Sequence, residues 1–180
     1  SLPSAEKLPQ IKTPKMSSIF TYIDNFQAKI GETPLLSYQF LGFMLITYLG
    51  LVTVGPIVCK NFKMKLHALS IVHNWVLILW SAAMNIGIVV AIARRAIHLG
   101  SFYRAAICIS DLESTADLLS GDLGFWLYQF HISKYYELVD TVFLILKGKK
   151  LIFLHIFHHF AMLFVTFAWF TDAWIVGAWY

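Results

Sequence analysis

Three histidines lie close together in an apolar stretch, and their spacing would place them on one face of a helix. The segment LHIFHHF puts His155, His158 and His159 at positions i, i+3 and i+4, which are neighbours on a helix surface. An imidazole can bind a metal ion, or it can act as a general base or a nucleophile. Imidazoles are poor neighbours for lipid, so these three should face polar partners or a cavity.

A second polar group occupies the apolar stretch just before the histidines. Residues 123–146 are long enough to cross a membrane, yet they contain a lysine and two acids. Each ionisable group at membrane depth costs about 2.5–3.5 kcal/mol on insertion scales. Taken alone, the group could be a structural salt-bridge cluster, or its lysine could reach out to interfacial water. One broad side of a helix carries all of its members: His131, Lys134, Glu137, Asp140 and Thr141.

Only the short turn KGKK (147–150) separates these two polar segments. An antiparallel hairpin would bring Asp140 and Thr141 close to the first turns of the following helix and to its histidines. Acids, a base and imidazoles would then gather near one face of the membrane. The sequence therefore predicts a reaction site shared by two neighbouring helices.

The composition requires that these helices lie in a membrane. The chain has 180 residues, of which 58% are hydrophobic and 13% are charged, whereas a soluble domain has about 45–50% apolar and about 25% charged residues. The net charge is +4, but the basic residues form short clusters between apolar stretches, so no nucleic-acid partner is expected. The predicted fold is all-α, a polytopic transmembrane helix bundle with spans at about 35–59, 66–93, 123–146 and 151–171.

The remaining segments complete the expected domain organisation. Residues 1–34 are mixed and polar and should lie outside the membrane, whereas residues 35–180 should form a partial membrane-embedded domain. Residues 94–122 carry basic and then acidic side chains and are expected to be interfacial or re-entrant, with a tilted buried helix as the alternative. The chain stops within an apolar stretch after Asp172, which predicts the start of a fifth span and a truncated product.

Two basic loops predict how the bundle is oriented. The loops at 60–65 and 147–150 must lie on the same side if the spans at 66–93 and 123–146 each cross once. The positive-inside rule makes that side cytosolic. Arg94 and Arg95 fall on the opposite side and argue in the other direction.

The two polar segments together resemble a known family. KYYELVDT (134–141) matches the pattern KxxExxDT, and LHIFHH (154–159) matches the pattern LHxxHH. Their order and spacing, with KGKK between them, resemble the ELO family of very-long-chain fatty acid elongases, most strongly over about 123–165. The resemblance implies a 3-ketoacyl-CoA synthase, a multi-pass protein of the endoplasmic reticulum with about seven spans. It would condense a long-chain acyl-CoA with malonyl-CoA and release CoA and carbon dioxide.

The resemblance also implies roles for individual residues. His158 would be the nucleophile, with the two other histidines as base and orienting groups. The lysine would stabilise a carboxylate or oxyanion, and the two acids would orient or tune the imidazoles. The expected catalytic residues are therefore His155, His158, His159, Lys134, Glu137 and Asp140. The expected substrate-binding residues are Thr141, His131, Asn74, Lys147, Lys149 and Lys150.

The family implies little need for other components. No metal ion and no cofactor are expected besides the acyl-CoA and malonyl-CoA substrates. The expected partners are the lipid bilayer, other enzymes of the elongation cycle and further copies of the same protein. The family's downstream motifs would lie past Tyr180, so these 180 residues are expected to be inactive alone.

Two other functions remain open from the residues themselves. Membrane di-iron desaturases and hydroxylases also carry the HxxHH pattern, but they require several histidine boxes, and the other histidines of this chain are scattered singly. A transporter or channel could use the buried charges as an ion path. The isolated histidines His67, His73 and His98 are expected to be structural.

Overall fold

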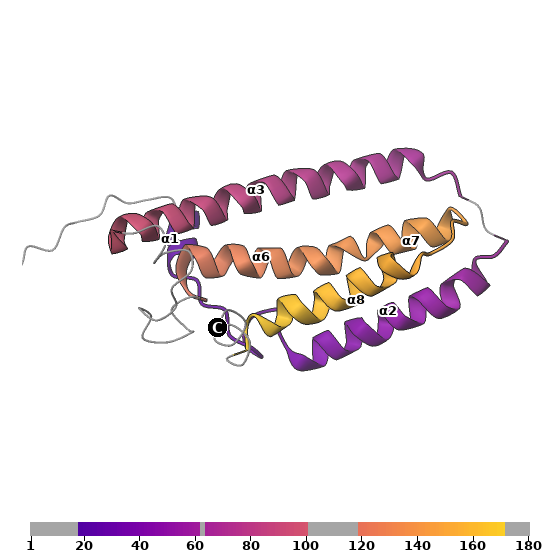
Figure 1. The fold of residues 1–180 in the computed structure, drawn as a ribbon, viewed down its shortest axis with the longest axis horizontal. Helices are drawn as coiled ribbons and strands as arrows, with labels where there is room; N and C mark the ends of the chain where they lie inside the picture. The colour runs from indigo at the N-terminus through magenta and orange to yellow at the C-terminus, as the bar shows by residue number, and fades with distance from the viewer. Residues whose placement is uncertain (1–17, 62–63, 101–118, 172–180) are drawn as a thin grey trace, which may run out of the picture.

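The computed structural model describes residues 18–61, 64–100 and 119–171 (Figure 1). Within these ranges every regular element is a helix, and the one extended pairing is an isolated antiparallel bridge between Gln27 and Ser120. The helices are α1 (Ser18–Asp24), α2 (Tyr38–Val58), α3 (His67–Leu99), α6 (Gly121–Glu137), α7 (Val139–Leu146) and α8 (Phe153–Ala168).

Two of these helices, α2 and α3, are long and apolar enough to cross a membrane. Their outer surfaces are covered with exposed aliphatic side chains, for example Ile46 and Ile57 on α2 and Ile97 on α3. Apolar surface of this extent is stable against lipid rather than water. Because the composition demands the same environment, the chain is a polytopic helical membrane bundle, and the predicted fold class is confirmed.

The long helices lie side by side with their axes roughly aligned (Figure 1). Helices α6 and α7 follow one another through the middle of the molecule. Helix α3 packs on α6 from one side and α8 packs on α6 from the other, while α2 packs against α8 and α7. Consecutive long helices run in opposite directions (Figure 1). The main core lies between α2, α6 and α8 and includes Tyr48, Tyr135, Leu163 and Phe167.

Helix α3 contacts the bundle through one narrow stripe. Its buried residues His73, Met84, Gly87 and Ala91 recur at spacings that keep them on one helical face. A Cβ atom built on Gly87 would lie 2.0 Å from Cε2 of Trp126 on α6. Glycine is therefore what allows α3 to approach α6 along this stripe.

The span expected at 123–146 is built from two consecutive helices that meet at Leu138. The backbone N–H of Leu138 donates to Tyr135 O at 3.3 Å, and that of Thr141 donates to Leu138 O at 3.1 Å. Both bonds reach back three residues, so the chain winds more tightly here than in an α-helix. The tight turn falls between Glu137 and Asp140. The angle around the helix axis between these two side chains therefore differs from that of a regular α-helix.

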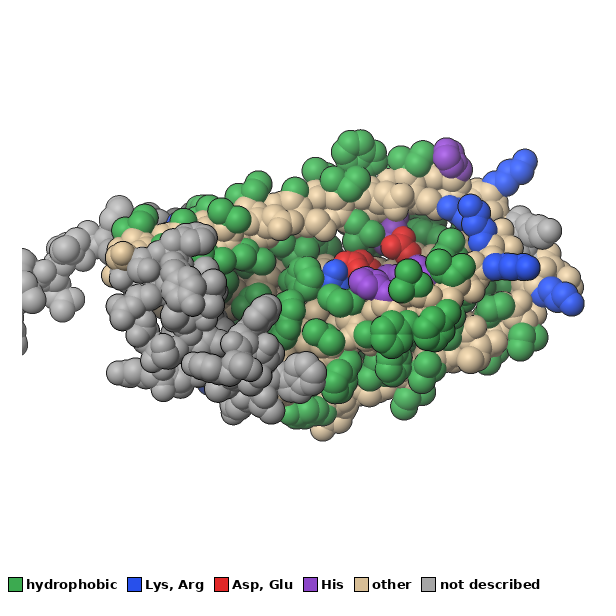
Figure 2. All heavy atoms as spheres, in the orientation of Figure 1, with side chains coloured by type: hydrophobic (Ala, Val, Ile, Leu, Met, Phe, Trp, Pro, Cys, Tyr) green, Lys and Arg blue, Asp and Glu red, His purple; other side chains and the backbone are tan. Residues whose placement is uncertain are grey.

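The two basic loops meet at one end of the bundle, as the sequence predicts. The backbone N–H of Met64 donates to Leu146 O at 3.0 Å, and Lys147 Nζ donates to Ser70 Oγ at 2.5 Å. Figure 2 shows basic side chains gathered at this end, and the basic residues of both loops are lysines. We call it the basic end. That it faces the cytosol stays a prediction.

The opposite end joins α1, α3 and α6. Arg94 Nη1 lies 3.7 Å from Asp24 Oδ1 and 3.4 Å from Asp122 Oδ2, and Gly121 N–H donates to Phe26 O at 2.7 Å. Helix α3 extends to Leu99, six residues into the segment expected to be interfacial. Residues 101–118, most of that segment, and residues 172–180, the expected start of a fifth span, lie outside the described residues.

Candidate active site

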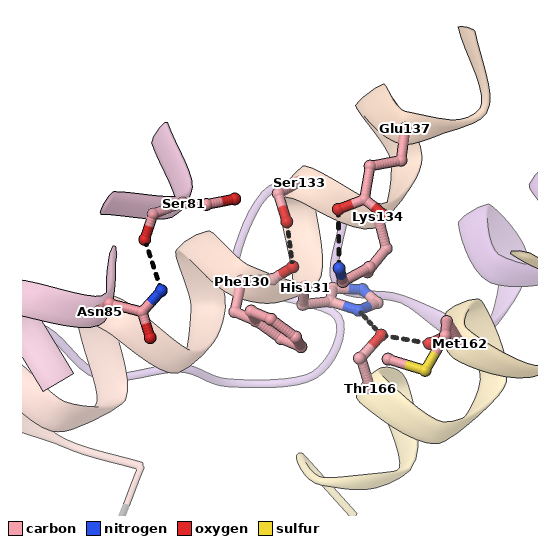
Figure 3. Close-up of polar contacts among 9 residues, drawn as sticks. All are labelled: Ser81, Asn85, Phe130, His131, Ser133, Lys134, Glu137, Met162 and Thr166. Atoms are coloured by element: carbon pink, nitrogen blue, oxygen red, sulfur yellow. Dashed lines mark hydrogen bonds and ion pairs between the residues drawn. The ribbon is translucent and has the colours of Figure 1, made fainter. Parts of the chain in front are cut away.

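Lys134 and Glu137 form an ion pair on α6. Lys134 Nζ donates to Glu137 Oε1 at 2.7 Å, with the two side chains only 13% and 16% exposed (Figure 3). The spacing i, i+3 places the partners one turn apart. Lys134 Nζ also lies 4.3 Å from the centroid of the Phe130 ring, a favourable position for a cation. Because an ammonium group has three donors, this lysine keeps donors for a ligand after pairing with Glu137.

Thr141 and His155 connect α7 to α8. Thr141 Oγ1 lies 2.9 Å from His155 Nε2, and the threonine is fully buried. The turn at 147–150 reverses the chain and brings these two positions together, as the hairpin prediction requires. This bond occupies one ring nitrogen of His155 and fixes the direction of its imidazole. His155 is therefore held in a fixed orientation by Thr141.

The three rings of the histidine box (His155, His158 and His159) lie in contact, but their environments differ. The ring centroids of His155 and His159 are 4.5 Å apart, and those of His158 and His159 are 5.6 Å apart. His159 is buried, His155 is half-buried and His158 is exposed. A substrate can thus reach His158 most readily, with His159 behind it.

Asp140 faces the histidine box from α7 and meets a further histidine on its other side. Its carboxylate interacts electrostatically with His155 and His159. Its Oδ1 atom lies 3.1 Å from Nε2 of His73 on α3. His73 is 4% exposed. The sequence predicts only a structural role for it and does not identify it as a neighbour of Asp140.

A positional signal could have revealed His73. It lies six residues after the start of α3, Asp140 lies six residues before the end of α7, and His159 lies six residues after the start of α8. All three helix ends are at the basic end, so the three side chains lie about 9 Å along their helices from it. Once the two basic loops are placed at the same end, counting residues from that end predicts that His73, Asp140 and His159 lie at the same depth in the bundle.

The polar residues are gathered in a hollow on one face of the bundle. Figure 2 shows acidic, lysine and histidine side chains together in a depression between α3 and α8, above the central helices, with hydrophobic side chains around it. The two polar segments therefore face a common space, as predicted, rather than pointing apart. A polar hollow within an apolar surface is an arrangement typical of membrane-embedded sites.

His131 lies in the interface between α6 and α8. Its Nδ1 atom is 2.9 Å from Thr166 Oγ1, and Thr166 donates its hydroxyl hydrogen to Met162 O at 2.6 Å (Figure 3). Because that hydrogen is already used, His131 must donate through Nδ1, which leaves Nε2 as an acceptor. His131 is fully buried and packs on the rings of Tyr135, Phe167 and Phe170.

The other expected substrate-binding residues lie elsewhere. Asn74 is exposed, and because it follows His73 directly, it leaves α3 about 100° around the helix from the buried stripe. Lys147 is half-buried against Ser70, while Lys149 and Lys150 are exposed at the basic end. The hollow with the histidine box thus lies apart from these lysines, which gather at the basic end.

Within the described ranges, no three histidine, cysteine or acidic side chains are placed to hold one metal ion together. The imidazoles of this region contact hydroxyl groups, a carboxylate and neighbouring rings. These side chains can supply an acid, a base and a nucleophile to a bound substrate.

Comparisons with known proteins agree with the motifs. The model of the ELO: GNS1/SUR4 family matches residues 33–180. Fatty acid elongase sre1 of Dictyostelium discoideum is 42% identical over 160 residues, covering 88% of this chain and 58% of the relative. Fatty acid elongase A of the same organism is 35% identical over 147 residues, covering 81% and 51%.

A relative from a second organism agrees with these matches. Fatty acid elongase 2 of Trypanosoma brucei brucei is 31% identical over 157 residues, covering 84% of this chain and 56% of the relative. The chain thus spans little more than half the length of these relatives. No solved structure matches it. The family match covers most of the chain and includes both polar motifs, so the chain belongs to the ELO family.

Proposed function

We propose that the protein to which this chain belongs elongates fatty acids. It condenses a long-chain acyl-CoA with malonyl-CoA to a 3-oxoacyl-CoA and releases CoA and carbon dioxide. The observation that carries this proposal is the hollow that holds the histidine box beside Asp140 and the Lys134–Glu137 pair. The family match and the names of the relatives support it.

The first step is transfer of the acyl group to an imidazole. A neutral ring nitrogen of His158 attacks the thioester carbonyl, the carbon–sulfur bond breaks, and CoA leaves as its thiol after taking up a proton. His158 is suited to this role because it is exposed and adjoins His159. His159 can accept or return the proton, and His155, held by Thr141, keeps the cluster aligned.

The second step forms the new carbon–carbon bond. Malonyl-CoA loses carbon dioxide, and the electron pair of the broken bond is left on the carbon next to the thioester as an enolate. This carbon attacks the acyl carbonyl, the bond to imidazole breaks, and the 3-oxoacyl-CoA is released. Negative charge develops on carbonyl oxygens in both steps, and donors already in place stabilise it. Lys134 can supply such a donor, because Glu137 fixes its position and uses one N–H.

The layout of the bundle fits two CoA substrates. Lys147, Lys149 and Lys150 at the basic end are placed to attract the phosphates of CoA. The thioester would then enter the hollow from that end, and the acyl chain would lie among apolar side chains between helices. We place the protein in the endoplasmic reticulum membrane with the basic end in the cytosol. Association with other enzymes of the elongation cycle, or with further copies, belongs to the same proposal.

Elongation can be measured directly. Full-length protein is expressed in microsomes that lack other elongases and is supplied with acyl-CoA and labelled malonyl-CoA. We expect incorporation of two-carbon units, which His158→Ala abolishes at unchanged protein level. The matched control is Phe157→Ala, since Phe157 is an exposed neighbour on the same helix. Full activity of His158→Ala, or no elongation by the unaltered protein across a range of acyl-CoAs, would contradict the proposal.

The isolated chain gives a second measurement. Residues 1–180 alone are expected to be inactive in the same assay, since the matched segment covers only 58% and 51% of two relatives. Clear elongation by the isolated chain would show that it carries the whole site.

A further inference from the structure

A buried histidine on a helix that is otherwise turned toward lipid requires an explanation. Most large side chains of α3 are exposed, yet His73 is 4% exposed. Placing an imidazole in an apolar span is unfavourable unless it has a polar partner. The structure gives His73 one such partner, the carboxylate of Asp140, at 3.1 Å.

Two aromatic rings fix the orientation of His73. Its ring centroid lies 4.8 Å from that of Tyr136 and 5.2 Å from that of Phe143. These residues come one turn before and one turn after Asp140, and all three side chains meet His73. The imidazole is thus held between two rings with its Nε2 atom beside Asp140. Simple packing of α3 would not need a polar atom at this point.

Asp140 is the link between His73 and the reaction site. One of its oxygens lies beside His73, while the carboxylate also acts on His155 and His159. The Asp140 side chain is 35% exposed, which opens it to the hollow. His73 Nε2 is at ion-pair distance from Asp140 without the alignment of a regular hydrogen bond. Because the Asp140 side chain is partly open to the hollow, a neighbour held in a fixed place is needed to keep its carboxylate in one orientation.

We propose that His73 is a positioning residue for the elongation reaction: it holds the Asp140 carboxylate toward the histidine box from a third helix. The inference rests on the proposed function and adds α3 to a site otherwise built from the central helices and α8. His73 does not touch the reacting atoms. Its contribution is to the orientation of Asp140, and hence to the rate of the chemical step rather than to substrate binding.

Paired amide substitutions test this role in the full-length protein. In His73→Gln the side-chain nitrogen can occupy the place of Nε2 and donate to Asp140, whereas in His73→Asn it is too short to do so. We expect His73→Gln to keep kcat within about threefold of the unaltered protein, and His73→Asn to lower kcat about tenfold, because small misplacements slow catalysis strongly. KM for both CoA substrates should change less than about twofold in each variant. Equal kcat for the two variants, or a loss confined to KM, would overturn the inference.

A second measurement asks whether His73 acts through Asp140. In an Asp140→Asn background, changing His73 to Asn should have little further effect on residual elongation, because the group that it positions is already altered. Full additivity of the two losses would overturn the inference. His67→Asn is the matched control, since His67 is an exposed histidine on the same helix, and it should leave kcat unchanged.

The two proposals fail in different ways. If the unaltered protein does not elongate acyl-CoA, the proposed function is wrong. If it elongates acyl-CoA and His73→Asn matches it in kcat, only the positioning role is wrong.

Discussion

Thr141 Oγ1 and His155 Nε2 are 2.9 Å apart across the hairpin between α7 and α8, and the threonine has no exposed surface. The bond joins the last residue of the KxxExxDT motif to the first histidine of the LHxxHH motif. Two motifs that are adjacent in sequence are thus joined into one site. An isolated hydroxyl in a buried position would be costly, so each residue supplies the polar partner that the other needs.

The first prediction concerns that bond. Thr141→Val keeps the shape of the side chain but removes the hydroxyl, so His155 loses its partner and the histidine box loses alignment. We expect the elongation rate to fall about 10- to 100-fold, measured with labelled malonyl-CoA in microsomes. Thr141→Ser retains the hydroxyl and should stay within a few-fold of the unaltered protein. Equal rates for the valine and serine variants would show that the bond has no role in the reaction.

The Lys134–Glu137 pair should contribute to stability and activity in separable ways. Lys134→Met leaves the carboxylate of Glu137 without its partner in a largely buried position, and removal of one member of such a pair costs about 3–5 kcal/mol. We expect a clear fall in the thermal unfolding midpoint of the purified protein in detergent. The double variant Lys134→Met/Glu137→Leu removes both charges and should recover most of that loss.

Activity distinguishes a structural pair from a functional one. If Lys134 supplies a donor to the developing oxyanion, the stable double variant should still fail to elongate acyl-CoA. A double variant that is both stable and active would reduce the pair to a structural salt bridge, the alternative that the sequence leaves open.

Local spacing explains which parts of the site could be predicted. Lys134 and Glu137 are three residues apart on one helix, and Thr141 and His155 are separated by a short basic turn. Each contact then follows from helix geometry and a tight hairpin, without knowledge of other helices. Letting the spans at 66–93 and 123–146 each cross once also predicts that the two basic loops lie on the same side, and the bond between Met64 and Leu146 places them at one end of the bundle.

Contacts between distant helices could not be predicted in this way. The sequence singled out Asn74 as a polar residue of the second span, whereas its neighbour His73 meets Asp140. One residue is about 100° of helix rotation, and the rotation of α3 is set by its packing on α6. Gly87 marks the face of α3 that packs on α6, because its missing side chain leaves room for Trp126. His73 lies about four turns away on the same face. The tight turn at Leu138 likewise has no proline or glycine to announce it.

Elongation should not depend on a metal ion. His155 of the histidine box contacts the Thr141 hydroxyl group, and the three rings contact one another. The proposed chemistry uses imidazole as the nucleophile. We expect full elongation activity in the presence of a strong chelator, and no stoichiometric iron in the purified full-length protein. Stoichiometric iron, with activity lost on chelation, would favour the desaturase or hydroxylase alternative.

The orientation of the bundle can be tested by labelling from one side of sealed microsomes. Lys149→Cys places a thiol at the basic end, and Arg95→Cys places one near the opposite end of α3. With all native cysteines, Cys59 and Cys108 among them, replaced by serine, a membrane-impermeant maleimide added outside should label Lys149→Cys at once and Arg95→Cys only after permeabilisation. The reverse pattern would place the basic end in the lumen and overturn the assignment made by the positive-inside rule.

The close packing of α3 on α6 can be tested by substituting Gly87. In Gly87→Ala the new methyl group would overlap the Trp126 ring, since the ideal Cβ lies 2.0 Å from Cε2. Overpacking of this kind costs about 1–3 kcal/mol, so the unfolding midpoint should fall. Gly50→Ala on α2 is the matched control, because a Cβ atom at this position would have nothing within 4 Å of it, and alanine there favours the helix.

Gly87→Ala should also affect the geometry of the candidate active site, because His73 lies on the same buried stripe of α3 as Gly87. If α3 moves outward to relieve the overlap, His73 moves away from Asp140 and kcat for elongation should fall along with stability. Adding Trp126→Leu removes the ring that meets the new methyl group, and it should restore both quantities together. Recovery of stability without recovery of kcat would mean that the position of α3 does not control the reaction.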